Sequence, residues 1–461
     1  MYYLAYSYFN REGTEKNFKK AFHWFTKAAE KDNINAMFNL AVCYKNGEGT
    51  EKNFEKAFHW YQKAAEKNHI DAMFILAVCY KFGEGTKKNF EKAFYWYQKA
   101  AEKDNIDAMF YLAYSYYIGK GTEKNLKNAF YWFQKAAEKD NINAMFNLAV
   151  CYYNGEGTEK NFINAFHWYQ KAAEKDNINA MFNLAVCYKN GIGTEKNFKK
   201  AFHWYQKAAE KDDIDAMFDL AVCYENGEGT EKNFEKAFHW IKKVAEKDNI
   251  NAMFNLAVCY KFGEGTEKNF EKTFYWFQKA AEKDNIDAMF NLAVCYKNGE
   301  GTEKNFEKAF YWFQKAAEKD NIDAMNYLAN IYYTGEGTEK NFKNAFHWYQ
   351  KAAEKDNIKA MFNLAVCYKN GEGTEKNFEK AFYWFQKAAE KDNIDAMNYL
   401  ANIYYTGEGT EKNFKNAFRW YQKAAEKDDI KAMFNLALCY KNGIGTEKNF
   451  EKAFHWYQKA A

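Results

Sequence analysis

Residues 36–71 read AMFNLAVCYKNGEGTEKNFEKAFHWYQKAAEKNHID, and this stretch decides the fold because it returns along the whole chain. The 13 methionines follow one another at steps of 36 residues, from Met1 to Met433. The 13 tryptophans keep the same step, from Trp24 to Trp456. A fixed period of this size is typical of stacked repeat architectures. The sequence therefore predicts a single array over residues 1–461, in which repeats begin at 36, 72, 108, 144, 180, 216, 252, 288, 324, 360, 396 and 432, and the first and last repeats are incomplete.

Each repeat has the pattern of two helices joined by a tight turn. Met37, Leu40 and Tyr44 recur at helical spacing and predict a first helix. The GEG turn that follows can adopt the positive φ angles that end a helix, and a stripe of Ala and aromatic residues then predicts a second helix. Asn33 and Asn53 stand where N-caps are expected. The fold class is therefore all-α, a right-handed α/α superhelical solenoid of about thirteen 36-residue helix-turn-helix repeats.

Composition excludes several function classes. Charged residues make up 28% of the chain and the net charge is only +4, so no basic surface for nucleic acid or membranes is expected. No run of 18 apolar residues could span a bilayer. Met1 already belongs to the repeat, so no signal peptide is expected. The nine cysteines are single and widely spaced, which favours a reducing compartment and a cytoplasmic location.

The repeated pattern Ala-x-x-x-Leu-Ala-x-x-Tyr-x-x-Gly-x-Gly, followed by Lys-Ala-x-x-Trp-Tyr-x-Lys-Ala-Ala-Glu, resembles the Sel-1-like repeat, a relative of the tetratricopeptide repeat. In residues 36–71 the matching positions are Ala36, Leu40, Ala41, Tyr44, Gly47, Gly49, Lys56, Ala57, Trp60, Tyr61, Lys63, Ala64, Ala65 and Glu66. The chain departs from the family where Ala41 replaces a frequent Gly, Thr50 and Glu51 a frequent Val-Pro, and Asn53 a frequent Asp. The resemblance implies a non-catalytic scaffold, because such arrays act as adaptors in signalling, membrane-protein quality control and enzyme assembly.

Comparison of the repeats argues against catalysis, metal binding and cofactors. The cysteines share one position, which Ser and Ile occupy in other repeats, so a small buried side chain is expected there. Most histidines share a position with Tyr95, Tyr131 and Arg419, and a metal ligand would not alternate with Arg. The Met and Trp ladders are interpreted as core, and truncation of a buried Trp would cost about 3–5 kcal/mol. We expect no catalytic residue, no metal ligand and no cofactor.

One face of the first helix varies while its core face is kept. Residues 288–302 read AMFNLAVCYKNGEGT, whereas residues 324–338 and 396–410 both read AMNYLANIYYTGEGT. The changed positions lie away from the conserved Met, Leu and Tyr, and residues 108–121 carry tyrosines on the same side. Tyrosine and asparagine suit peptide-binding surfaces. The predicted partner-binding residues, on the inner wall of the array, are Asn326, Tyr327, Asn330, Tyr333, Asn398, Tyr399, Asn402, Tyr405, Tyr111, Tyr114 and Tyr117.

Duplication and drift form an alternative explanation of these changes. Residues 288–359 and 360–431 differ only at His347 against Arg419 and at Asn357 against Asp429. A tandem duplication of two repeats therefore accounts for the second copy without selection. The first copy is then explained either by binding or by drift on an exposed face.

Three functions follow from the sequence. The favoured function is a non-catalytic protein-interaction scaffold or adaptor whose protein partner is unidentified and binds on the concave surface. The alternatives are a self-associating array or a fragment of a larger signalling protein, since neither end carries a polar cap. Single-stranded nucleic-acid binding is less favoured because the net charge is small.

Overall fold

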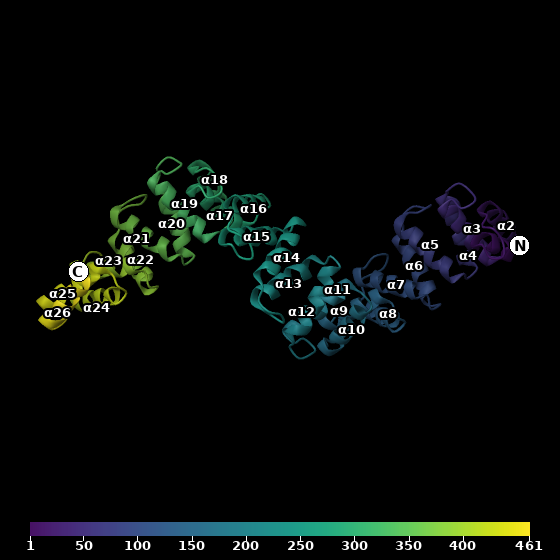
Figure 1. Cartoon of the computed structure of the whole chain (residues 1–461), viewed down its shortest axis with the longest axis horizontal. Helices are drawn as coiled ribbons and strands as arrows, with labels where there is room; N and C mark the ends of the chain where they lie inside the picture. The colour runs from purple at the N-terminus through teal and green to yellow at the C-terminus, as the bar shows by residue number, and fades with distance from the viewer. The chain divides into compact units, whose positions relative to one another are not determined.

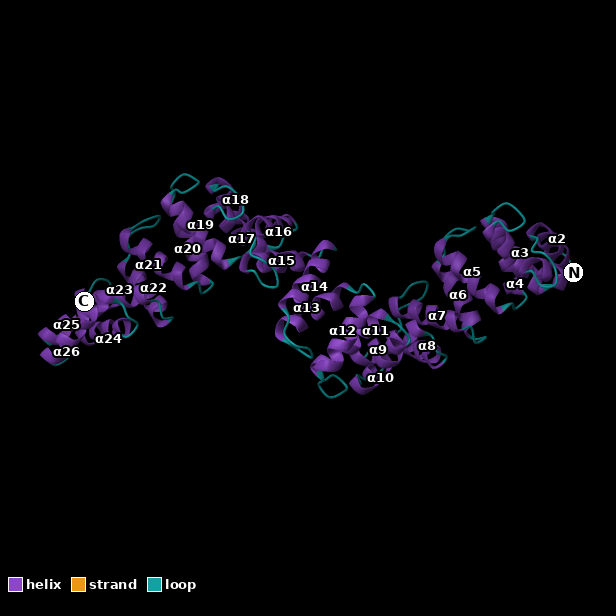
Figure 2. Ribbon diagram, viewed as in Figure 1, coloured by secondary structure: helices purple, strands orange, loops and turns teal.

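The computed structural model describes residues 1–461, which form 26 helices and no strands (Figures 1 and 2). The chain divides into two compact units, Met1–Asn233 and Phe234–Ala461. The helices of the first unit are α1 Tyr2–Asn10, α2 Phe18–Ala29, α3 Ile34–Asn46, α4 Phe54–Glu66, α5 Ile70–Phe82, α6 Phe90–Ala101, α7 Ile106–Ile118, α8 Leu126–Glu138, α9 Ile142–Asn154, α10 Phe162–Glu174, α11 Ile178–Asn190, α12 Phe198–Glu210 and α13 Ile214–Asn226. Those of the second unit are α14 Phe234–Glu246, α15 Ile250–Phe262, α16 Phe270–Glu282, α17 Ile286–Asn298, α18 Phe306–Glu318, α19 Ile322–Thr334, α20 Phe342–Glu354, α21 Ile358–Asn370, α22 Phe378–Glu390, α23 Ile394–Thr406, α24 Phe414–Ala425, α25 Ile430–Asn442 and α26 Phe450–Ala460.

Within each unit, consecutive helices pair into hairpins, and each hairpin packs on the next (Figure 1). The odd-numbered helices are the first helices of the repeats and the even-numbered ones are the second helices, and the architecture is an all-α solenoid. Leu40 and Met37 are buried in the hairpin core, as are Ala41 and Ala57, whose small side chains allow the two helices to approach closely. The predicted helix-turn-helix repeats are confirmed.

Asparagine side chains begin the helices, as the sequence predicts. The Oδ1 of Asn33 accepts the backbone N–H of Ala36 at 2.8 Å, and the Oδ1 of Asn53 accepts that of Lys56 at 2.9 Å. Gly47 ends α3 with a φ of 79°. These bonds satisfy backbone groups that would otherwise lack partners at helix termini. Each boundary is therefore set by the residues beside it.

The second glycine of the turn allows neighbouring repeats to touch through their backbones. Gly49 has a φ of 78°, and a Cβ added to it would lie 2.1 Å from the carbonyl oxygen of Phe18, at the start of the preceding second helix. No residue with a side chain fits that approach without a shift. The glycine thus serves both the turn and the stacking of one repeat on the previous one.

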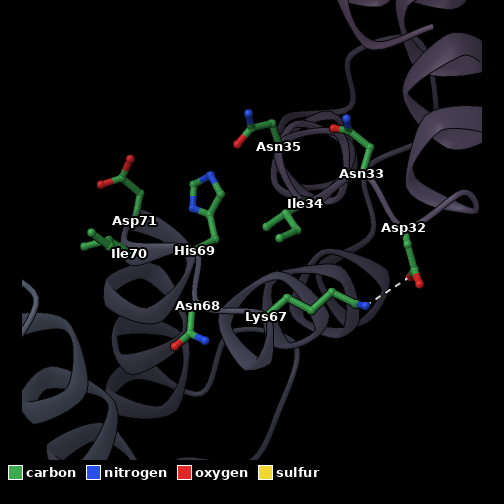
Figure 3. Close-up of a pocket in the computed structure, with 9 residues that line it drawn as sticks. All are labelled: Asp32, Asn33, Ile34, Asn35, Lys67, Asn68, His69, Ile70 and Asp71. Atoms are coloured by element: carbon green, nitrogen blue, oxygen red, sulfur yellow. Dashed lines mark ion pairs between the residues drawn. The ribbon is translucent and has the colours of Figure 1, made fainter.

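An ion-pair ladder, which the sequence analysis missed, runs along the connectors between repeats. Asp32 adopts a left-handed conformation with a φ of 65°, and its carboxylate lies 3.3 Å from Lys67 Nζ in the next connector. Figure 3 shows this pair beside an open depression between α3 and α5. The same pair recurs at Asp104–Lys139, Asp140–Lys175, Asp176–Lys211, Asp248–Lys283, Asp284–Lys319, Asp320–Lys355, Asp356–Lys391 and Asp392–Lys427. Exposed pairs of this kind each contribute about 0–1 kcal/mol.

The interpretation of the tryptophans as core residues was wrong. All of them are half-buried, whereas the repeated methionines from Met37 onward are buried. Trp60 lies on the flank of α4, where Lys63 Nζ sits 4.7 Å from the centre of its ring. Tyr61, Ala64 and Ala65 fill the core side of that helix instead. The indole therefore covers the core from its outer edge rather than filling it.

Candidate partner-binding face on the first helices

The residue directly after each repeated methionine lies where three helices meet. In residues 36–71 this residue is Phe38, whose ring centre is 5.7 Å from that of Tyr61 on its own second helix. The same ring stacks on His69, the N-cap of the next first helix, at 4.6 Å. Phe38 is half-buried, so part of its ring reaches the surface. This position therefore belongs both to the repeat interface and to the face of the first helix.

In α19 and α23 this position holds Asn326 and Asn398, and both side chains are buried. Their exposed fractions are 4% and 8%. The Oδ1 of each is buried without a hydrogen-bond partner. The Nδ2 of Asn398 donates to the Oδ1 of Asp429, the N-cap of α25, at 2.8 Å. The sequence placed these asparagines on an exposed face, and the structure corrects this: the shorter side chain stays below the level that a phenylalanine ring reaches.

Four residues further on, Asn330 and Asn402 turn toward their own second helices. The hydroxyl of Tyr349 donates to the Oδ1 of Asn330 at 2.6 Å, and that of Tyr421 donates to Asn402 in the same way at 2.6 Å. Most other repeats carry Val here, except for Tyr6, Tyr114 and Leu438, and in one repeat with Val the buried hydroxyl of Tyr97 has no partner. Asn330 and Asn402 thus satisfy a tyrosine hydroxyl inside the repeat, a role that sequence reasoning did not assign to them.

One predicted tyrosine on each of α7, α19 and α23 stacks on an aromatic ring of the preceding second helix. Tyr327 lies on Phe313 with ring centres 5.2 Å apart and planes 8° apart. The equivalent pairs are Tyr399 on Phe385 and Tyr111 on Tyr97. A lysine of the preceding first helix covers each of these tyrosine rings, at 5.1 Å for Lys297, 4.9 Å for Lys369 and 4.3 Å for Lys81. These tyrosines form fixed platforms across a repeat junction.

The last tyrosines of α7, α19 and α23 differ in their hydrogen-bond partners. Tyr333 and Tyr117 donate hydrogen bonds of 2.9 Å to Glu372 and Glu156 in the next turn. Burial and the neighbouring carboxylate raise the pKa of both hydroxyls to about 12. For Tyr405 the equivalent residue in the next turn is Ile444 instead of a glutamate, and Tyr405 is 41% exposed. Tyr114 is 40% exposed on the same face of α7.

The structure brings the predicted residues together in three groups. Each group lies on one first helix, and the members are Tyr111, Tyr114 and Tyr117 on α7, Asn326, Tyr327, Asn330 and Tyr333 on α19, and Asn398, Tyr399, Asn402 and Tyr405 on α23. Tyr349 and Tyr421 join the last two groups, although the sequence analysis did not include them. A usable signal existed, because their position holds Tyr or Phe in every repeat except at Ile241, and both Asn-bearing repeats carry Tyr.

The remaining reactive side chains have structural surroundings. The cysteine position is buried, and burial raises the pKa of the Cys43 and Cys151 thiols to about 12. The histidines of the shared position are exposed, as at His59. No group of three or more His, Cys, Asp or Glu side chains is arranged to hold a metal ion. No helix combines the length and the apolar character that a membrane crossing requires.

Comparison with known proteins agrees with this architecture. The Sel1 repeat family matches the chain in thirteen consecutive stretches, at residues 1–33, 34–69, 70–105, 106–141, 142–177, 178–213, 214–249, 250–285, 286–321, 322–357, 358–393, 394–429 and 430–461. The chain belongs to the Sel1 repeat family. These Sel1 repeats begin two residues before the alanine that marks each repeat in the sequence analysis, so the two divisions describe the same units.

Solved structures share the Sel1 repeat fold. The chain is 31% identical to c5321, a protective antigen present in uropathogenic Escherichia coli strains that displays an SLR fold, with a TM-score of 0.82 and coverage of 95% of this chain and 94% of that chain. A Sel1 repeat protein from Oxalobacter formigenes is 24% identical, with a TM-score of 0.56 over 65% of this chain and 87% of that chain. No curated protein sequence matches the chain. Solenoids of Sel1 repeats are typical of protein-interaction scaffolds.

Proposed function

We propose that the chain is a non-catalytic scaffold whose first helices bind a segment of a protein partner along the concave face. The observation that carries this proposal is that α19 and α23 differ from most other first helices along one face. Met325, Leu328 and their counterparts stay buried, while the new tyrosines lie on the side that meets solvent and the neighbouring repeats. Two further changes, at Asn330 and Ile331, serve the interior of the repeat. Surface residues that differ between repeats, on helices whose core residues stay the same, are expected of a recognition surface on a fixed framework.

The chemistry of the rewritten face supports a peptide partner. Tyr327 and Tyr399 are held by stacking on Phe313 and Phe385, so little side-chain entropy is lost when a partner covers them. Tyrosine also combines a large apolar area with a hydrogen-bonding group, as in known interfaces. The exposed edge of Tyr405 extends this surface in α23.

An affinity capture with two matched baits tests the proposal. One bait is the native chain, and the other carries AMFNLAVCYKNGEGT at residues 324–338 and 396–410, the sequence that the chain itself holds at 288–302. Both must first show the same helical circular dichroism and the same melting temperature. The proposal expects a purified partner, identified by mass spectrometry, to bind the native chain directly and to lose at least tenfold in affinity for the restored chain. Equal binding of every recovered protein to both baits would contradict it.

A further inference from the structure

Two consecutive turns in residues 83–125 carry lysine where other repeats carry an acid. Lys120 is the one basic residue at its position, which holds Glu in most repeats and Ile at residues 192 and 444. Lys87 is also alone, because every other repeat has Glu at the same position. Each change exchanges a negative charge for a positive one. The turns after α5 and α7 are therefore more basic than any other pair of neighbouring turns in the array.

Lys120 removes the acid from an ion pair between two repeats. At the preceding junction, Lys45 Nζ lies 3.4 Å from a carboxylate oxygen of Glu84. The equivalent residues one repeat later are Lys81 and Lys120, and neither lies within ion-pair distance of a carboxylate. Burial lowers the pKa of Lys81, and the nearby positive charge of Lys120 lowers it further. Two cations thus lie near each other where the preceding junction holds a cation and an anion.

Exposed apolar side chains surround these lysines. Lys81 Nζ lies 5.1 Å from the ring centre of Phe82 and 4.3 Å from that of Tyr111 on α7. Phe82 is 59% exposed and Ile118 is 43% exposed, at a position where most repeats carry Asn. Apolar side chains that lie together on a surface mark binding sites more often than isolated ones do. We call Lys81, Phe82, Tyr111, Ile118 and Lys120 the basic patch.

We propose that the basic patch binds an acidic segment of a protein partner, in which a carboxylate lies between Lys81 and Lys120 and an adjacent apolar side chain covers Phe82. The partner would supply the anion that this junction lacks. Hydrogen bonds between ammonium and carboxylate groups are stronger than neutral ones, and the neighbouring apolar surface excludes part of the water that screens them. This inference rests on the proposed function and names the chemistry of the partner where it meets α5 and α7.

The surroundings of the basic patch favour a short acidic segment over a polyanion. Glu91 and Glu123 line the open depression between the start of α6 and the turn after α7. At the next junction, Tyr117 is bonded to Glu156. A nucleic-acid strand needs a track of cations that continues along the array, and these carboxylates interrupt such a track. A protein segment with an acidic and an apolar residue needs only the patch itself.

The chain contains a matched site without the reversed charge. Lys261 and Phe262 end α15 as Lys81 and Phe82 end α5, and Phe262 is 57% exposed. The next turn there carries Glu300 at the position of Lys120. An exposed phenylalanine beside a lysine is thus common to both sites, and the unpaired positive charge is not. The inference expects acidic segments to bind at α5 and α7 only.

Panning of a random peptide library displayed on phage against the full chain tests the inference. Enriched peptides are synthesised, and their dissociation constants are measured for the native chain and three variants. K120E restores the glutamate of other repeats, and F82N restores their asparagine. F262N makes the same change at the matched site. Because each variant carries a residue that the chain itself has at that position elsewhere, we expect circular dichroism and melting to be unchanged.

The inference expects enriched peptides to combine Asp or Glu with a neighbouring apolar residue. Their affinity for K120E and for F82N should fall at least about tenfold, and their affinity for F262N should equal that for the native chain. Replacement of the acidic residue of a peptide by its amide should weaken binding to the native chain but not to K120E. Enriched peptides without an acidic residue, or equal binding to the native and K120E chains, would overturn the inference.

The remaining outcomes separate this inference from the proposed function. A fluorescent oligouridylate that displaces the peptides and binds the native chain more tightly than they do would overturn a protein partner at the patch. Peptides that bind K120E as well as the native chain but lose affinity for Y327N/Y399N would overturn the basic patch and leave the first-helix face as the binding surface. Failure to enrich any peptide on the native chain over K120E would also overturn the basic patch. Peptides whose affinity depends on no first-helix substitution would contradict the proposed function as well.

Discussion

The hydroxyl of Tyr349 lies 2.6 Å from the Oδ1 of Asn330, and this bond joins the two helices of one repeat from within. In residues 72–107 the corresponding positions hold Tyr97 and Val78, and the hydroxyl of Tyr97 is buried without a partner. The chain therefore contains both the satisfied and the unsatisfied form of the same contact. Part of the rewritten sequence in α19 consequently serves stability rather than recognition.

Substitution of Asn330 by Val should remove this bond and expose the cost of an unsatisfied hydroxyl. We expect N330V to reduce the local free energy of unfolding by about 1–3 kcal/mol, the typical cost of leaving a buried polar group unpaired. Native-state hydrogen exchange of the amides in α19 and α20 measures the change. The double variant N330V/Y349F reproduces the Val294–Phe313 pair of the preceding repeat and should recover most of the loss. If N330V/Y349F lost as much stability as N330V or more, the bond between Tyr349 and Asn330 would not explain the loss in N330V.

His69 should make the start of α5 sensitive to pH. Its Nδ1 accepts the backbone N–H of Ala72 at 3.2 Å, which requires the neutral ring. Burial lowers the pKa of His69 below its usual 6.5, while nearby Asp71 opposes the shift. The folded state thus prefers the neutral ring, and the stabilisation is fully present above pH 6.5 and is lost as the pH falls below 6.5 through the folded-state pKa.

The variant H69N, which restores the asparagine cap of other repeats, should remove this dependence. Relative to H69N, the native chain should lose about 1 kcal/mol of stability between pH 7.5 and pH 5, the typical value of an N-cap. Urea denaturation at the two pH values measures the difference. H59N, at an exposed histidine of α4, is the control and should leave the native pH profile unchanged. The same profile in H69N and in the native chain would refute the assignment.

The two glycines of one turn should tolerate alanine very differently. Gly47 and Gly49 have φ angles of 79° and 78°, so backbone strain is equal for both. The added Cβ meets only ordinary contacts at Gly47, the nearest at 3.5 Å, but at Gly49 it lies 2.1 Å from the carbonyl oxygen of Phe18. We expect G47A to cost about 1–2 kcal/mol and G49A to cost at least about 2 kcal/mol more, measured by urea denaturation. Equal costs would show that the repeats do not approach as closely as described.

The cysteines should resist alkylation in the folded chain. Burial raises the pKa of Cys43, Cys151 and Cys187 to about 12, so the thiolate fraction at pH 8 is on the order of 10⁻⁴. We expect iodoacetamide to modify these thiols at least 100-fold more slowly in buffer than in guanidinium chloride, as followed by peptide mass spectrometry. Fast modification of the native chain at any of these three sites would contradict their burial.

Truncation of Trp60 should cost less than the sequence alone suggested. The indole is half-buried, and Lys63 covers part of its face. We expect W60A to destabilise the chain by about 2 kcal/mol, below the 3–5 kcal/mol of a fully buried tryptophan. L40A removes a side chain with 0% exposure and should cost about 2–5 kcal/mol, so it provides the reference in the same urea experiments. A larger loss of stability in W60A than in L40A would indicate that Trp60 is a core residue after all.

Local features of the repeat could be predicted because each depends on residues close together in the chain. The asparagine caps bond three residues ahead, as from Asn33 to Ala36, and glycine ends each first helix for reasons of backbone geometry alone. The buried cysteine position was also predicted, because Ser and Ile replace Cys there in other repeats. The sequence placed the candidate residues of α19 on one exposed face, but it did not predict that Asn326 is buried or that Asn330 turns toward α20.

The sequence by itself determined the period, the helix boundaries, the turn and the all-α solenoid, since thirteen copies of one pattern repeat the same local interactions. Only the tertiary structure decided that Asn326 is buried, that Trp60 is not, and that Asn330 bonds a tyrosine 19 residues away. It also distinguished two helices of identical sequence, because Tyr333 reaches Glu372, 39 residues ahead, while the residue 39 ahead of Tyr405 is Ile444, which cannot accept that hydrogen bond. The physical reason is that exposure and pairing on this face depend on what the adjacent helix and the next repeat place against it.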